Sequence, residues 1–330
     1  MIRHWVWKEV KKINRRILGV AVTFILVATL VAPLTTIVQA KKLTETDMGD
    51  YTEYVGTLDH ANFVVRIPDE WNGMLVVGCH AYMEPGWTPD AQFAVDNLVN
   101  GDGIGLPFVL LEQGFAYAAS SYGEGGFSVK MGMTRTHQLT EYVIDNFGVT
   151  GKVFIIGHSL GGAIGLLLGE KYPELYDGVL DISAMKDIIM GYNDCVNIIA
   201  TIESIPEVIW NSLPQAEKDY LLFMLSMLKQ MKADMEADYG GTYDDKPQHY
   251  EKRNPASNAE ISIPMITVNG ALDPLMSPAQ AVSFEIAVAE AGCSEYYRLY
   301  TAAGGAHGDP PTIDEALLHF EELVDYPAGW

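Results

Sequence analysis

The stretch that most constrains this 330-residue chain is 152–162, which reads K-V-F-I-I-G-H-S-L-G-G. Residues 153–157 form a short apolar run, typical of a strand buried on both faces of a parallel sheet. Residues 163–172 follow with the pattern of an apolar helix. Ser159 lies between them with a glycine two residues away on each side, which lets strand and helix approach closely. This arrangement predicts a nucleophilic serine at a tight turn, and a serine that only caps the helix is the alternative.

Strand and helix patterns alternate along most of the chain. The segments expected as further strands are 62–68, 74–79, 115–120, 178–183, 265–270 and 295–301. Those expected as further helices are 134–147, 277–291 and 312–326. The alternation predicts an α/β fold with a mostly parallel, doubly wound sheet.

Residues 184–263 interrupt this alternation with helical patterns and no strand, which predicts a helical lid insertion after the sixth core strand. In an open α/β sheet the site lies beyond the carboxyl ends of the strands, so the insertion should emerge beside Ser159. Methionines recur within it at 224, 227, 231 and 235, at near-helical spacing. This stripe fits either a buried core or an adaptable apolar surface that contacts the substrate.

The first 40 residues have the composition of an export segment. Six lysines and arginines precede an apolar run over 17–34, and V-Q-A at 38–40 offers the small residues of a cleavage site. The segment is expected to be a signal peptide, with an uncleaved membrane anchor as the alternative. In both cases residues 41–330 form the exported body of the protein, secreted or held on the outer face of the membrane.

The body of the chain is strongly acidic. Removing six basic residues and one glutamate from 21 Lys+Arg and 43 Asp+Glu leaves a net charge of −27. This charge excludes nucleic acid as an expected partner, because phosphate binding needs basic surface. A membrane is expected as a partner only through an uncleaved N-terminal segment.

The cysteines and histidines indicate no metal or cofactor. The chain has three cysteines, Cys79, Cys195 and Cys293, so at most one disulfide can form among them. Neither they nor the eight histidines show metal-ligand spacing.

A nucleophilic serine needs a base and a carboxylate that orients the base. Asp273 follows the strand expected at 265–270, and His307 lies in a glycine-rich loop after the last expected strand. The resulting order, Ser, Asp, His, is that of nucleophile-elbow hydrolases. Asp187 is the alternative carboxylate, and Asp309 lies too close to His307 in sequence to orient its ring.

The oxyanion that forms during acyl transfer needs two N–H donors. Leu160 supplies one at the start of the helix, and Tyr82, after the strand at 74–79, is expected to supply the second. The ring of Tyr82 is also expected to line the acyl pocket. His158 is expected to point away from the serine Oγ and to pack beside the site, where it contributes to substrate binding. His80 is expected to fix its own loop.

With these residues placed, the chain resembles α/β-hydrolase-fold serine esterases and lipases from about residue 62 to the C-terminus. The motifs G-H-S-L-G-G, G-A-L-D-P and G-G-A-H-G carry the resemblance. The segments I-P-D-E-W-N-G-M-L-V-V-G-C-H-A-Y and G-F-A-Y-A-A-S-S-Y also resemble those of exported bacterial-type hydrolases. Such relatives usually carry His-Gly-X where this chain has His80-Ala81-Tyr82, so the second oxyanion donor departs from the pattern.

The resemblance implies hydrolysis of carboxylic esters through an acyl-enzyme on Ser159. The expected partner is a small-molecule or polymeric ester with a hydrophobic or polymer-derived acyl group. An amidase, a peptidase or an acyltransferase would use the same residues, because only the leaving group or the acceptor differs. A non-enzymatic surface-binding protein on the same fold is a third alternative, and the intact Ser, Asp, His order argues against it.

Overall fold

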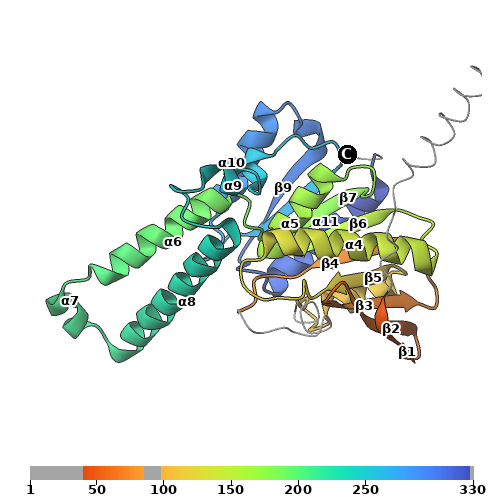
Figure 1. Ribbon diagram of the computed structural model, residues 1–330, viewed down its shortest axis with the longest axis horizontal. Coiled ribbons are helices and arrows are strands. Elements are labelled where there is room, and N and C mark those ends of the chain that lie inside the picture. Colours follow the sequence, from red (N-terminus) through yellow and green to blue (C-terminus); the bar gives the residue numbers. More distant parts are fainter. Residues whose placement is uncertain (1–39, 85–97, 328–330) are drawn as a thin grey trace, which may run out of the picture. The chain divides into compact units, whose positions relative to one another are not determined.

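The computed structural model describes residues 40–84 and 98–327, and these contain one sheet of nine strands (Figure 1). The strands are β1 (Lys41–Asp47), β2 (Tyr51–Leu58), β3 (Ala61–Pro68), β4 (Leu75–Cys79), β5 (Ala116–Ser120), β6 (Val153–His158), β7 (Gly178–Ile182), β8 (Met265–Gly270) and β9 (Tyr297–Ala302). Their order is β1-β2-β3-β5-β4-β6-β7-β8-β9. Every pair from β5 to β9 across the sheet is parallel, whereas β1, β2, β3 and β5 pair antiparallel. The predicted α/β class with a mostly parallel sheet is confirmed.

Helices pack on both faces of this sheet. The described helices are α3 (Leu106–Glu112), α4 (Val129–Phe147), α5 (Leu160–Lys171), α6 (Ile188–Glu203), α7 (Glu207–Ser212), α8 (Gln215–Tyr239), α9 (Pro247–Glu251), α10 (Pro278–Glu290) and α11 (Pro310–Asp325), with short 3-10 turns at Pro255–Ser257 and Ser294–Tyr296. Of these, α6 to α9 belong to the segment between β7 and β8, and α6, α7 and α8 extend away from the sheet (Figure 1). Alternate residues of β6 show the two layers. Ile155 packs toward Gly165 of α5, whereas the ring of Phe154 lies 5.4 Å from that of Phe320 on α11. Because alternate residues of a strand point to opposite faces, β6 contributes side chains to the apolar packing on both faces of the sheet.

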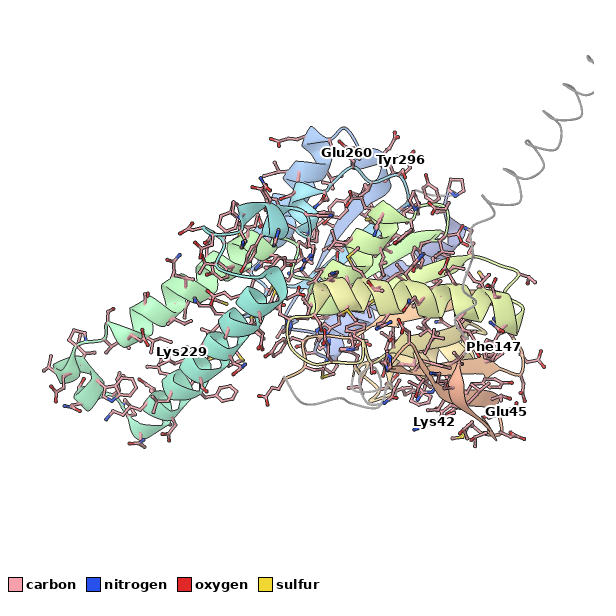
Figure 2. The ribbon with its side chains drawn as sticks, in the orientation of Figure 1. Lys42, Glu45, Phe147, Lys229, Glu260 and Tyr296 are labelled. Carbon is pink, nitrogen blue, oxygen red and sulfur yellow. The ribbon has the colours of Figure 1, made fainter. Side chains whose placement is uncertain are left out.

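The strands β1 and β2 at the antiparallel edge of the sheet were not expected from the sequence, whereas β3 was expected at 62–68. Every residue of β1 is exposed, and Figure 2 shows Lys42 and Glu45 on this strand. The sequence of β1, K-K-L-T-E-T-D, gives it no apolar face by which to recognise a strand, and charges on an edge strand discourage pairing with other chains.

The helical insertion lies between β7 and β8, after the seventh strand in chain order rather than the sixth. Its helices α6 and α8 lie side by side (Figure 1). The Tyr192 hydroxyl of α6 donates to Glu236 of α8 at 2.7 Å, and the Cys195 thiol lies 3.9 Å from the sulfur of Met231. Lys229 of α8, labelled in Figure 2, forms an exposed ion pair with Glu203 of α6, which is a further contact between the two helices.

The predicted export segment falls outside the described residues, apart from Ala40, and its cleavage or anchoring stays a prediction. Within the described residues, no helix combines the length and apolarity that a membrane span requires. Cys79, Cys195 and Cys293 are all free thiols, and the first two are buried.

Candidate active site

Ser159 occupies a strained turn between β6 and α5. Its φ of 56° and ψ of −119° lie outside the regions that non-glycine residues favour, a strain of roughly 1–3 kcal/mol. A side chain at Gly157 or Gly161 would overlap backbone atoms of α5 or β4, so only glycine fits beside the turn. The Ser159 N–H donates to the Ile182 carbonyl at 3.0 Å, and its carbonyl accepts from the Met185 N–H at 3.1 Å. The end of β7 thus holds the serine in place.

His307 and Asp273 come from loops after adjacent strands, β9 and β8. The Nδ1 atom of His307 lies 2.8 Å from Oδ2 of Asp273, while Oδ1 of the same carboxylate accepts N–H bonds from Leu275 and Met276 at 2.9 and 2.8 Å. Burial alone raises the pKa of Asp273, but His307 and these two N–H groups outweigh it and hold the pKa below its ordinary value. The carboxylate is therefore charged and fixed, as an orienting acid must be.

Ser159 and His307 line the same cavity, which has a volume of about 700 Å³. Its other walls come from the loop after β4, from α8 and from the loop after β8. The side chains that line it include Tyr82, Met83, Phe223, Met227, Met231, Leu275 and Met276. The cavity is thus mostly apolar and has the Ser159 side chain and the His307 imidazole in its wall, and small-molecule sites commonly combine an apolar lining with a few polar groups.

His158 packs directly beside the imidazole of His307, with ring centroids 4.8 Å apart. Burial, and then the charge of His307, lower the pKa of His158 to about 3, so this ring is neutral at physiological pH. Gly308 has a φ of 67°, and a Cβ there would overlap Nε2 of His158. Sequence reasoning singled out His158 but missed Gly308, whose only signal was its place after the histidine.

The two expected oxyanion donors lie at the same edge of the sheet. Leu160 is the first residue of α5, where helical N–H groups have no acceptor within the helix. Tyr82 lines the cavity, and its hydroxyl donates to Asp234 of α8 at 2.5 Å. Burial and then the neighbouring Asp234 raise the pKa of this hydroxyl. Tyr82 is therefore tied to the insertion, which the sequence did not suggest.

His80 precedes this loop and is buried. Its ring stacks on Tyr122 at 3.8 Å, and its Nδ1 lies 2.7 Å from the carbonyl oxygen of Ala81. Burial lowers the pKa of His80 to about 4, so it stays neutral and helps to set the path of the chain into Tyr82.

The other carboxylates considered for the site serve helix ends. Asp187 accepts the Met190 N–H at 3.0 Å and caps α6, and Asp309 accepts the Ala306 N–H and caps α11. Of the candidate carboxylates, Asp273 is the one whose oxygen contacts the His307 ring. Among the described residues, no group of three or more His, Cys, Asp or Glu side chains is arranged to hold a metal ion.

A buried charge network contacts the loop that carries Asp273. Lys186 and Asp181 are fully buried, with Nζ and Oδ1 2.8 Å apart, and Nζ also donates to Asn269 at 2.8 Å. Asn269 in turn donates to the Met276 carbonyl at 3.3 Å. Sequence reasoning missed this network, because a lysine after a strand gives no sign that it is buried.

The methionine stripe of α8 divides between two roles. Met227 and Met231 line the cavity, whereas Met235 is completely buried in the packing of the insertion. The helical period groups these residues on one side, but it does not reveal what lies opposite each of them.

Solved structures share the fold at low sequence identity. A Pyrococcus furiosus esterase aligns with a TM-score of 0.53 and 13% identity, over 87% of this chain and 90% of that one. The Pyrococcus horikoshii acylaminoacyl peptidase aligns with a TM-score of 0.52 and 12% identity, over 92% and 44%. The Porphyromonas gingivalis dipeptidyl peptidase 4 aligns with a TM-score of 0.51 and 11% identity, over 86% and 35%. The chain thus spans less than half of the length of these peptidases, and the likenesses concern the fold alone.

No curated protein matches the chain by sequence. A family model does match, the one described as "Putative esterase", over residues 121–300. This match covers more than half of the chain and includes Ser159 and Asp273, while His307 lies beyond its end. With the strained serine turn and the α/β-hydrolase fold of its structural neighbours, the match shows that the chain belongs to this Esterase family and is a hydrolase of the serine type.

Proposed function

We propose that the chain hydrolyses carboxylic esters, with Ser159 as nucleophile, His307 as general base and Asp273 as the acid that orients the base. The observation that carries this proposal is the His307–Asp273 pair at 2.8 Å, in the wall of the cavity that also holds the strained Ser159. A serine that only caps α5 would need neither the pair nor the strain.

The reaction proceeds in two halves. The Ser159 Oγ attacks the ester carbonyl carbon while Nε2 of His307 takes the hydroxyl proton, and Asp273 accepts the Nδ1–H and stabilises the resulting imidazolium. The imidazolium then returns the proton to the alcohol oxygen as the C–O bond breaks, which leaves an acyl-enzyme. Water attacks the acyl-enzyme with the same base, and the carboxylic acid departs as the serine recovers its proton.

The negative oxygen of each tetrahedral intermediate is stabilised by the backbone N–H groups of Leu160 and Tyr82. Each such donor typically contributes on the order of 100- to 1,000-fold in rate. Leu160 is favoured for this role by its place at the start of a helix, where the dipole also attracts negative charge.

The acyl group lies against the apolar wall formed by α8 and the loop after β8. Met227 and Met231 give this wall flexible, polarisable side chains, which suit acyl chains of varied shape. The insertion therefore acts as a lid that sets substrate choice. The esterase family supports an ester over an amide or an acyl-transfer acceptor, which remain the alternatives for the same residues.

Labelling with a fluorophosphonate probe tests the nucleophile. Ser159→Ala should abolish labelling and leave the circular dichroism spectrum unchanged. Ser183→Ala is the matched control, because Ser183 is also buried, also has a positive φ, and follows the neighbouring strand. Labelling that survives in Ser159→Ala would contradict the proposal.

A panel of p-nitrophenyl esters of increasing chain length, beside a p-nitroanilide, tests the substrate class. Ester turnover well above anilide turnover is expected. Met227→Ala should shift the preferred chain length, whereas Met224→Ala, on the same helix outside the cavity lining, should not. Faster anilide cleavage would favour the amidase alternative, and an unchanged ranking in Met227→Ala would refute the lid role.

A further inference from the structure

A second cavity, of about 420 Å³, lies apart from the active site and gathers basic side chains. Lys130 and Met133 come from α4, Lys171 and Tyr172 from the end of α5, and Lys252 and Arg253 from the segment after α9. Three elements distant in sequence therefore contribute cations to one concave surface. Its volume falls within the range of roughly 300–1,000 Å³ that is usual for small-molecule sites.

This clustering is unusual for so acidic a chain. Of its 21 lysines and arginines, six lie in the first 40 residues, so four of the remaining 15 line this one cavity. No aspartate or glutamate from the described residues lines it. The chain has a net charge of −22, so an even scatter of charge would have placed carboxylates there.

Packing does not account for these cations. In the described part of the chain, Lys130, Lys171 and Lys252 form no ion pair, and the Lys171 ammonium lies 4.9 Å from the centre of its neighbour's ring, Tyr172. Arg253 differs, because Asp238 accepts from its guanidinium at 3.0 Å and fixes it. Three exposed ammonium groups thus line one concave surface, and each would attract a bound anion.

We propose that this cavity binds a small anion with two or more negative charges on oxygen, of the phosphate or polycarboxylate class. The three ammonium groups supply the charge, and Tyr172 and Met133 supply an apolar wall for the body of the ligand. The site is independent of the ester chemistry, because none of its residues lines the cavity of Ser159.

The position of the cavity gives the bound anion a structural effect. Lys252 and Arg253 belong to the end of the insertion, whereas Lys130 and Lys171 belong to helices that pack on the sheet. An anion held by both sets links the insertion to α4 and α5. Binding should therefore raise the unfolding temperature of the whole chain, and the rise should continue with the logarithm of the anion concentration above Kd.

Isothermal titration calorimetry of the full chain with pyrophosphate and, separately, with citrate tests the site. Saturable binding with one site per chain is expected for at least one of the two, and the stronger ligand distinguishes the phosphate from the carboxylate source. The Lys171→Gln/Lys252→Gln double variant should weaken binding at least tenfold. Lys218→Gln, which removes a partly exposed lysine of α8 outside the cavity, is the control and should bind as wild type does.

Absence of saturable binding by both anions up to about 10 mM would overturn the proposal. An equal loss in the double variant and in Lys218→Gln would also overturn it, because the attraction would then be a property of the whole surface. Ester hydrolysis by the double variant should match wild type, so this test and the test of the proposed function fail independently.

Discussion

Gly308→Ala tests how the base is positioned. A methyl group at this residue overlaps Nε2 of His158, whose ring packs against that of His307. Either the His158 ring or the loop that carries His307 must therefore shift, and both changes would disturb the contact between the two rings. A misplacement of about 1 Å at a catalytic group costs on the order of 100-fold in rate, which corresponds to about 2.7 kcal/mol. We expect kcat/KM for p-nitrophenyl butyrate to fall by that factor.

Gly304→Ala is the matched control in the same loop. Gly304 also has a positive φ, 79°, but nothing lies within 4 Å of the Cβ that it would gain. Both variants bear a left-handed strain of roughly 1–2 kcal/mol, so their free energies of unfolding in urea should fall by similar amounts. Only Gly308→Ala should lose activity.

The double variant His158→Ala/Gly308→Ala removes the overlap and should recover part of the lost rate. If Gly304→Ala loses as much activity as Gly308→Ala, backbone strain rather than contact with His158 explains the effect. If Gly308→Ala keeps its activity, the two rings do not fix the base, and the argument from packing is refuted.

Three further predictions concern buried or partly buried polar groups. Tyr82→Phe and Asp234→Asn should each lower kcat on p-nitrophenyl esters about tenfold, because each removes the same charge-assisted hydrogen bond. The double variant should lose no more kcat than either single variant, and additive losses would contradict this prediction. Burial lowers the pKa of His80 to about 4, so the free energy of unfolding should fall as pH drops below about 6.5, where the unfolded chain takes up the proton. Between pH 7 and 5, wild type should lose about 2 kcal/mol more than His80→Asn in urea titrations. Parallel pH curves for the two proteins would refute this prediction. Lys186→Met should cost roughly 3–5 kcal/mol in the same assay, because it leaves the Asp181 carboxylate buried without its cation, and a loss under 1 kcal/mol would show that the pair is dispensable.

The parallel part of the sheet was predictable from sequence because its strands are buried on both faces. β4 and β6 read as nearly continuous apolar runs and β7 and β8 as mostly apolar ones, and the motif residues Ser159 and Asp273 follow the carboxyl ends of β6 and β8. Since parallel strands end at one edge, the order of the motifs was enough to predict that Ser159, Asp273 and His307 share a region. The geometry between them required the structure.

The N-terminal hairpin could not be read in the same way. β1 is exposed along its whole length, so neither the helical nor the strand period appears in its sequence. The start of α4 was also placed late, at residue 134 instead of 129, because Gly132 is a weak helix former. Gly132 is nevertheless favourable there, because any larger residue would collide with Ile164 of α5.

Contacts between the insertion and the loops of the sheet depend on tertiary packing, so sequence patterns do not predict them. The Tyr82–Asp234 hydrogen bond joins residues 152 positions apart, and the division of the α8 methionines follows from where this helix lies. Such pairs form because the fold brings the two elements together. In the sequence, a single tyrosine or aspartate does not indicate which residue it will contact. The helical period fixes which residues share a face, but not what that face meets.

The methionines of the cavity wall also carry a chemical sensitivity. An oxidant that adds one oxygen to the sulfur of Met227, Met231 or Met276 turns a soft apolar surface into a polar sulfoxide. The wall would then lose its affinity for hydrocarbon, while Ser159 would still react with a small phosphonate. Methionine sulfoxide reductase would reverse the change, so exposure to peroxide could narrow the substrate range of the protein without destroying its chemistry.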